Sequence, residues 1–152
     1  MQARRWIDSE TALVPWYPNE AVALAWYQDE RLCRQVDNRP EPYTVERLRA
    51  MYAYLSSRGR CYYIEYRGAL VGDVTLKDDG EIAIVVCREY QNLGIGRRCV
   101  RDMLALAREL GMHEVKANVY SFNAQSRRMF EAVGFEPIGD EWYVYRIKEQ
   151  TT

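Results

Sequence analysis

The sequence predicts one domain over residues 1–152, of the α/β (α+β) class, in which a mostly antiparallel sheet is flanked by helices. A length of 152 residues suits a single domain, and the 48% hydrophobic content is enough for one continuous core. Three neighbouring segments rich in aromatic and β-branched residues lie near the middle of the chain, separated by short turns. Segments with apolar residues at helical spacing stand on both sides of them. This order favours helices packed on a sheet.

Two helices are expected before the strands. A short helix is expected over Asn19 to Gln28, with Asn19 as its N-cap. Thr44 predicts the cap of a second helix, whose apolar residues recur at helical spacing until Gly59 ends it. Four of the five prolines precede residue 43, so the amino-terminal third is otherwise expected to be rich in loops.

The strand segments are Cys61 to Tyr66, Ala69 to Leu76 and Glu81 to Cys87. The turns between them are short, which favours an antiparallel meander. The third segment is apolar on both faces, and this pattern predicts a central strand rather than an edge strand.

The carboxy-terminal half predicts two more helices and two more strands. The first helix is expected over Ile95 to Leu110, closed by Gly111, and a strand over Val115 to Tyr120 follows it. The second helix is expected between its cap Asn123 and Gly134, which ends it. The last strand is expected over Trp142 to Ile147.

Composition excludes several classes of protein. With 21 basic and 22 acidic residues interspersed, the chain has no long-range field that would attract nucleic acid or an anionic membrane. The first residues lack the apolar stretch of a signal peptide, and no segment approaches a bilayer span, so we expect a cytoplasmic protein. Four cysteines without metal-site spacing and a single histidine, His113, predict reduced thiols and no metal.

The segment Gln91 to Gly96 stands between an expected strand and an expected long helix. Such a turn presents backbone N–H groups and a helix amino terminus to an anion, and phosphate is the natural ligand. Glycine at 94 and 96 would let a phosphate approach, and Arg97 and Arg98 could add charged contacts. The two glycines could also serve a tight turn and nothing else.

Two other phosphate-binding motifs fit poorly. A dinucleotide-binding turn needs a third glycine near position 99, where the chain has Cys99, and Glu114 is badly placed for a ribose ligand. A Walker-type loop needs glycine, lysine and a hydroxyl residue in succession, which residues 96–98 do not supply.

The pattern Gln91-x-x-Gly94-x-Gly96 resembles the coenzyme A pyrophosphate loop of GNAT acetyltransferases. Downstream, Asn123-x-x-Ser126-x-x-x-Phe130-Glu131-x-x-Gly134-Phe135 resembles the second signature of that family, in which a strand end and a helix line the pantetheine arm. The separation of the two motifs and the order of the elements match as well.

The resemblance implies a GNAT fold, with a central mixed, mostly antiparallel twisted sheet of about six to seven strands flanked by about four helices. It implies an N-acetyltransferase that uses acetyl-CoA as cosubstrate and needs no metal. It also implies the residues that would bind the cofactor. They are Val85, Val86, Cys87, Gln91, Asn92, Leu93, Gly94, Ile95, Gly96, Arg97, Asn123, Ser126 and Phe130.

Acetyl transfer to an amine needs a neutral nucleophile, a polarised thioester carbonyl and a proton for the leaving thiolate. The N–H of Val86 or Cys87 is expected to polarise the carbonyl. Glu81 is the candidate base, or else a surface-turn residue. Many family members donate the proton from a tyrosine where this chain has Phe130. Tyr120, Tyr143 or a water molecule could replace it. We take Tyr120, which ends the strand before Asn123, as the candidate acid, or else as a packing aromatic.

The acceptor is left open as an amine on a protein amino terminus, a lysine or a small molecule. Aromatic residues of the acceptor side could line its pocket or pack in the core. A noncatalytic acyl-CoA-binding sensor or regulatory module is the competing class, and Phe130 is the feature that favours it. The resemblance also leaves a homodimer open, since many members of the family pair.

Overall fold

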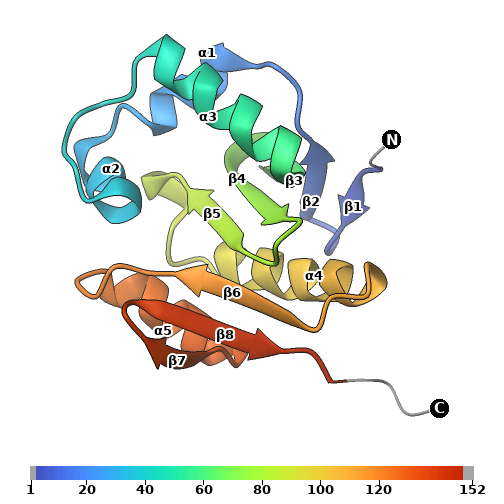
Figure 1. Cartoon of the computed structure of the whole chain (residues 1–152). Coiled ribbons are helices and arrows are strands. Elements are labelled where there is room, and N and C mark those ends of the chain that lie inside the picture. The colour runs from blue at the N-terminus through green and yellow to red at the C-terminus, as the bar shows by residue number, and fades with distance from the viewer. Residues whose placement is uncertain (1–2, 149–152) are drawn as a thin grey trace.

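Two sheets and five α-helices make up the computed structural model, which describes residues 3–148 (Figure 1). The strands are β1 (Arg5–Trp6), β2 (Thr11–Pro15), β3 (Gly59–Tyr66), β4 (Ala69–Lys77), β5 (Ile82–Val86), β6 (Glu114–Asn118), β7 (Glu136–Gly139) and β8 (Trp142–Arg146). The helices are α1 (Glu20–Trp26), α2 (Glu30–Asp37), α3 (Val45–Arg58), α4 (Ile95–Glu109) and α5 (Ala124–Val133), with a 3-10 helix, η1 (Arg88–Tyr90), between β5 and α4. The mixed α/β class predicted from the sequence is confirmed.

Strands β3, β4 and β5 form the expected antiparallel meander. β1 and β2 extend it, giving the order β1-β2-β3-β4-β5 with every pair antiparallel. The second sheet has the order β6-β8-β7. β1, β2 and β7 fall in segments for which the sequence predicts no strand. They have only two to five residues, too few for a clear alternation, and β2 and β7 each contain a proline.

The prediction of a central position for β5 is wrong. β5 lies between β4 and β6 in the molecule, but it is the last strand of its own sheet. An isolated parallel bridge between Glu81 and Lys116 joins it to β6, and the two strands then separate. The apolar residues Ile84 to Val86 stay half-buried because they border a cavity instead of a neighbouring strand.

Most local signals at helix ends behave as expected. The hydroxyl of Thr44 accepts a hydrogen bond from the N–H of Arg47 at 3.1 Å, and Gly134 closes α5 with φ of 116°. Asn19 occupies the N-cap position of α1, although its side chain makes no capping hydrogen bond. Gly59 ends α3 by a different means, since its backbone is extended and a Cβ there would collide with the backbone of Leu76.

Helix α2 corrects the expectation of a loop-rich amino-terminal third. It has eight residues, and Asp29 caps it by accepting hydrogen bonds from the N–H groups of Arg31 at 2.9 Å and Leu32 at 3.4 Å. Its few apolar residues are too sparse for a helical period to stand out in the sequence.

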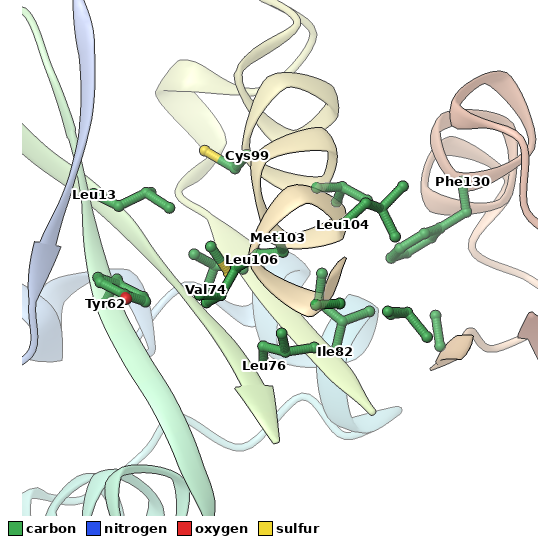
Figure 2. Packing of buried hydrophobic residues seen from close by; sticks show 14 of the residues in the cluster. Leu13, Tyr62, Val74, Leu76, Ile82, Cys99, Met103, Leu104, Leu106 and Phe130 are labelled. Atoms are coloured by element: carbon green, nitrogen blue, oxygen red, sulfur yellow. The ribbon is translucent and has the colours of Figure 1, made fainter. Parts of the chain in front are cut away.

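The larger core lies where α4 packs on one face of the five-stranded sheet and α5 joins it (Figure 2). Met103, Leu106 and Ala107 of α4 are fully or almost fully buried there. Its side chains are mostly aliphatic, and they hold β5 and the amino end of α4 in a fixed relation.

A second core lies beneath α1, α2 and α3 on the opposite face of the sheet. It is rich in tyrosine, and it encloses the carboxylate of Asp73 on β4. The hydroxyls of Tyr27 and Tyr52 donate to Oδ2 of Asp73 at 2.6 and 2.8 Å. Burial raises the pKa of Asp73 to about 6, an effect that the two tyrosine hydrogen bonds oppose.

Candidate active site

The turn between β5 and α4 leads into the amino end of a helix. After η1, Asn92 and Gly94 both take left-handed conformations, with φ of 65° and 79°. α4 then begins at Ile95, with no side chain capping it and no acidic residue in its first turn. The first N–H groups of a helix have no partner within it, and the helix dipole makes this end positive. The geometry therefore suits a phosphate group.

The two arginines of the turn differ in role. Arg97 lines the cavity in front of the helix. Arg98 instead braces the turn from behind, pairing with Asp8 at 2.8 Å and donating hydrogen bonds to the carbonyls of Leu93 and Gly94 at 3.2 Å. Of the two, only Arg97 is placed to meet a ligand in the cavity.

A cavity of about 300 Å³ lies between β5, α2, α5 and the start of α4. It brings together most of the residues expected to bind the cofactor. These are Val85, Val86, Gln91, Asn92, Gly94, Ile95, Gly96, Arg97, Asn123 and Ser126. Residues of the two sequence motifs, about 30 positions apart, thus line one space.

Three of the expected residues do not line this cavity. Leu93 is exposed on the turn, and Phe130 is buried in the larger core against Phe135, with ring centroids 5.0 Å apart. Cys87 lies in a second groove described below. Burial raises the pKa of the Cys87 thiol, which keeps it protonated near neutral pH.

The free edge of β5 offers backbone groups to the cavity. The N–H of Cys87 already donates to the carbonyl of Val71 at 2.8 Å. Because backbone groups alternate in direction along a strand, the N–H and C=O of Val86 point away from β4, toward the free edge. The carbonyl of Val86 accepts a hydrogen bond from Nε2 of Gln91 at 2.8 Å. The N–H of Val86, and not that of Cys87, is the one available at this edge.

Asn123 caps α5 as expected, while its role in cofactor binding stays a prediction. Its Oδ1 accepts the N–H of Ser126 at 3.2 Å and so caps α5. Its amide Nδ2 faces the other way and donates to the carbonyl of Gln35 at 3.3 Å. The cap thus holds an amide donor at the mouth of the cavity.

The space around Gly96 shows how closely a ligand can approach the backbone at the start of α4. A Cβ at this position would meet only Met129, Ile84 and Val86, all at 3.9 to 4.0 Å. The protein would tolerate a methyl group there, but a larger side chain would fill the space before the helix end. The residues present therefore fit a ligand that comes close to the backbone.

The two candidate catalytic residues lie outside the cavity lining. Glu81 precedes β5, about 10 Å along the strand from Ile84, and its carboxylate accepts a hydrogen bond from Lys77 at 3.2 Å. Tyr120 follows β6 and stacks on Phe122, with ring centroids 5.5 Å apart. Their catalytic roles stay predictions.

Several cavity residues are absent from the sequence-based set. They are Leu32, Gln35, Val36, Ile84, Tyr90, Gln125, Arg128 and Met129. Gln125, Arg128 and Met129 follow from the helical period of a capped α5, a signal that was available in the sequence. The α2 residues come from an element that the sequence did not reveal.

A second groove, the α1 groove, lies on the other side of the end of β5. Its volume is about 640 Å³, and Tyr90 borders both it and the cavity. Its lining consists of Ala21, Val22, Ala25, Trp26, Asp29, Ala69, Leu70, Cys87, Arg88, Glu89 and Tyr90. The walls combine apolar side chains with one basic residue, Arg88, and two carboxylates, those of Asp29 and Glu89.

Two kinds of feature are absent from residues 3–148. No helix in this part of the chain has the length and apolarity to cross a membrane. The same residues contain no group of three or more His, Cys, Asp or Glu side chains that could hold a metal ion.

Comparison with known proteins agrees with this geometry. The mouse N-acetyltransferase family 8 member 3 is 25% identical over an alignment of 103 residues, and the match covers 60% of this chain and 46% of that protein. The chain therefore spans less than half the length of this relative. The crystal structure of a GNAT-family acetyltransferase from Bacillus anthracis superposes with a TM-score of 0.78 at 16% identity, covering 91% of this chain and 95% of that one.

Spermidine N-acetyltransferase from Vibrio cholerae, solved with CoA and spermine, has a TM-score of 0.73 at 16% identity, over 90% of this chain and 93% of that one. At such identities the two solved structures support the fold alone. The model of the acetyltransferase (GNAT) domain matches residues 11–136. Since this match covers most of the chain and both of its motifs, the protein belongs to the GNAT acetyltransferase family.

Proposed function

We propose that the protein is an N-acetyltransferase that moves an acetyl group from acetyl-CoA to a primary amine by direct attack in a ternary complex. The observation that carries this proposal is the cavity in which residues of both motifs meet at the positive end of α4. When bound there, acetyl-CoA supplies an activated acetyl thioester.

Each wall of the cavity has a task in this proposal. The N–H groups from Gly94 to Arg97 would hold the pyrophosphate, with the Arg97 guanidinium beside them. The Val86 edge of β5 and the amide of Asn123 would bind the pantetheine arm. The N–H of Val86 would also stabilise negative charge that develops on the thioester oxygen.

Proton transfer is assigned to two residues outside the cavity lining. Glu81 is proposed to accept the amine proton through water, and the Tyr120 hydroxyl to donate one to the leaving thiolate. Glu81→Gln and Tyr120→Phe test these roles separately. If each residue acts as proposed, its variant lowers kcat by about 100-fold without weakening acetyl-CoA binding. A wild-type kcat in either variant removes that residue from the mechanism.

The acceptor amine is proposed to enter through the α1 groove. Support comes from its position beside the end of β5 and from its charge. Arg88 pairs with Asp29 at 3.3 Å, which leaves the Glu89 carboxylate as the net negative charge that attracts a cationic amine. A relative of the same fold, the Vibrio cholerae enzyme, is a spermidine N-acetyltransferase, which makes polyamines one class to test. Peptide amino termini and lysine side chains are the others. A cytoplasmic location and a homodimer stay predictions.

The first experiment is calorimetric titration of the purified protein with acetyl-CoA, with NADH and ATP as controls. Thiol release is then measured against a panel of polyamines, peptides and aminoglycosides. Selective binding with amine-dependent thiol release is the expected result. Selective binding without release for any amine would favour the noncatalytic sensor, and no binding would refute the proposal.

A further inference from the structure

Helix α2 separates the two hollows described above. Asp29, its N-cap, lines the α1 groove and pairs with Arg88 at 3.3 Å. Leu32, Gln35 and Val36, one to two turns further on, line the cofactor cavity. A shift of this helix would therefore change both hollows together.

Gln35 is the residue of α2 that joins both cofactor motifs. Its side-chain Oε1 accepts a hydrogen bond from Nε2 of Gln91 at 3.1 Å. Its backbone carbonyl accepts one from Nδ2 of Asn123 at 3.3 Å. Gln91 belongs to the turn before α4 and Asn123 to the cap of α5, so Gln35 ties α2 to both sides of the cavity.

A helix as short as α2 depends on such ties. Eight residues form no stable helix in water without tertiary contacts. Leu32 and Cys33 are buried, whereas Gln35 and Val36 are half-buried beside the hollow. A ligand that fills the hollow would supply the packing that this face of α2 lacks.

We infer that Gln35 is a positioning residue that couples α2 to the occupied cofactor cavity, so that the α1 groove takes its acceptor-binding shape when the cofactor is bound. The inference rests on the proposed function, because it takes coenzyme A as the ligand of the cavity. The link is reciprocal: a ligand in the groove that holds Asp29 would also favour the cofactor-bound arrangement.

Hydrogen exchange at the amides of residues 30–37, with and without saturating coenzyme A, tests the coupling. In the wild-type protein, coenzyme A should slow exchange there by at least about tenfold, because opening of α2 now also costs ligand contacts. In Gln35→Ala this protection should fall below about threefold, while the affinity for coenzyme A drops only by about fivefold, the value of one hydrogen bond.

Two further variants separate the tie from general damage to the helix. Arg34→Ala alters the exposed neighbouring position on α2 and should keep the wild-type protection. Gln35→Glu retains an oxygen that can accept from Gln91 and should restore protection at saturating coenzyme A. Loss of protection in all three variants would overturn the inference.

The KM for the amine distinguishes this coupling from a role of Gln35 in stability alone. With Gln35→Ala the KM for the amine should rise about fivefold at saturating acetyl-CoA, with kcat within about twofold of wild type. Unchanged protection of α2 in a wild-type protein that binds coenzyme A would overturn the inference alone. Failure of the wild-type protein to bind coenzyme A would overturn the proposed function and this inference with it.

Discussion

The core around α4 and the core beneath α1 to α3 hold the two faces of the same sheet, and they are built from different side chains. The first is mostly aliphatic and supports the amino end of α4. The second is rich in tyrosine and contains Asp73, the one charged residue among the buried residues of the described chain. Aliphatic packing does not titrate, whereas a buried carboxyl does. We call the side of the sheet packed by α4 the cofactor face and the side packed by α1 to α3 the acceptor face, after their proposed ligands. The cofactor face should keep its structure over a wide pH range, while the acceptor face should respond to pH.

The largest effect is expected on the cofactor face, from Gly96→Glu. A carboxylate at this position would occupy the space before α4 and repel a phosphate, so coenzyme A affinity should fall by at least about 100-fold. An acidic residue in the first turn suits the helix dipole, so the protein should stay folded. Calorimetry and thermal melting measure the two effects, with Gly96→Ala as the matched control. Unchanged affinity in Gly96→Glu would remove the phosphate from this turn.

On the acceptor face, Asp73→Asn should change how stability depends on pH. The folded protein raises the pKa of Asp73 from 3.8 to about 6, so it binds this proton more tightly than the unfolded chain does. Protonated Asp73 therefore adds about 3 kcal/mol to the free energy of unfolding below about pH 4. This stabilisation is lost as the pH rises through about 6. Asparagine cannot ionise. Urea unfolding should show the variant gaining about 3 kcal/mol over wild type between pH 4 and pH 7; parallel profiles would contradict this account.

Tyr52→Phe should give a smaller effect in the same network. It keeps the ring and removes one of the two hydroxyls that donate to Asp73. The free energy of unfolding should fall by about 1 to 2 kcal/mol at pH 7. Because this hydrogen bond favours the ionised carboxyl, its loss should also raise the pKa of Asp73 and move the loss of stability to higher pH. Tyr54→Phe, at a half-exposed position on the same helix, is the control, and an equal effect there would place the cause outside the network.

The smallest effect is expected at the surface of the α1 groove. Glu89 is exposed, so its attraction for a cationic amine is screened by solvent. Glu89→Lys should raise the KM for a polyamine about fivefold at low salt and much less at high salt, with coenzyme A affinity unchanged. A KM that does not respond to this charge reversal would place the acceptor outside the groove.

Prediction from sequence works best where the signal is local. The cap at Asn123, the stop at Gly134 and the turn at Gly94 each depend on a few adjacent residues, and all three are found as expected. It fails at α2, which contacts distant parts of the chain: Gln35 accepts a hydrogen bond from Gln91, and Leu32 lies in the second core. It also misplaces β5, because an apolar strand next to a cavity has the same composition as one between two other strands.

The sequence by itself determined the fold class, the family and the glycine turn before α4, because glycine positions and helix caps act through the local backbone. Tertiary structure alone decided three other features: that the N–H of Val86 stands at a free edge, that Arg98 braces the turn, and that Asp73 is buried between two tyrosines. Each depends on where distant segments of the chain lie: β6 diverges from β5, Asp8 approaches α4, and Tyr27 and Tyr52 reach Asp73. No local pattern encodes these positions.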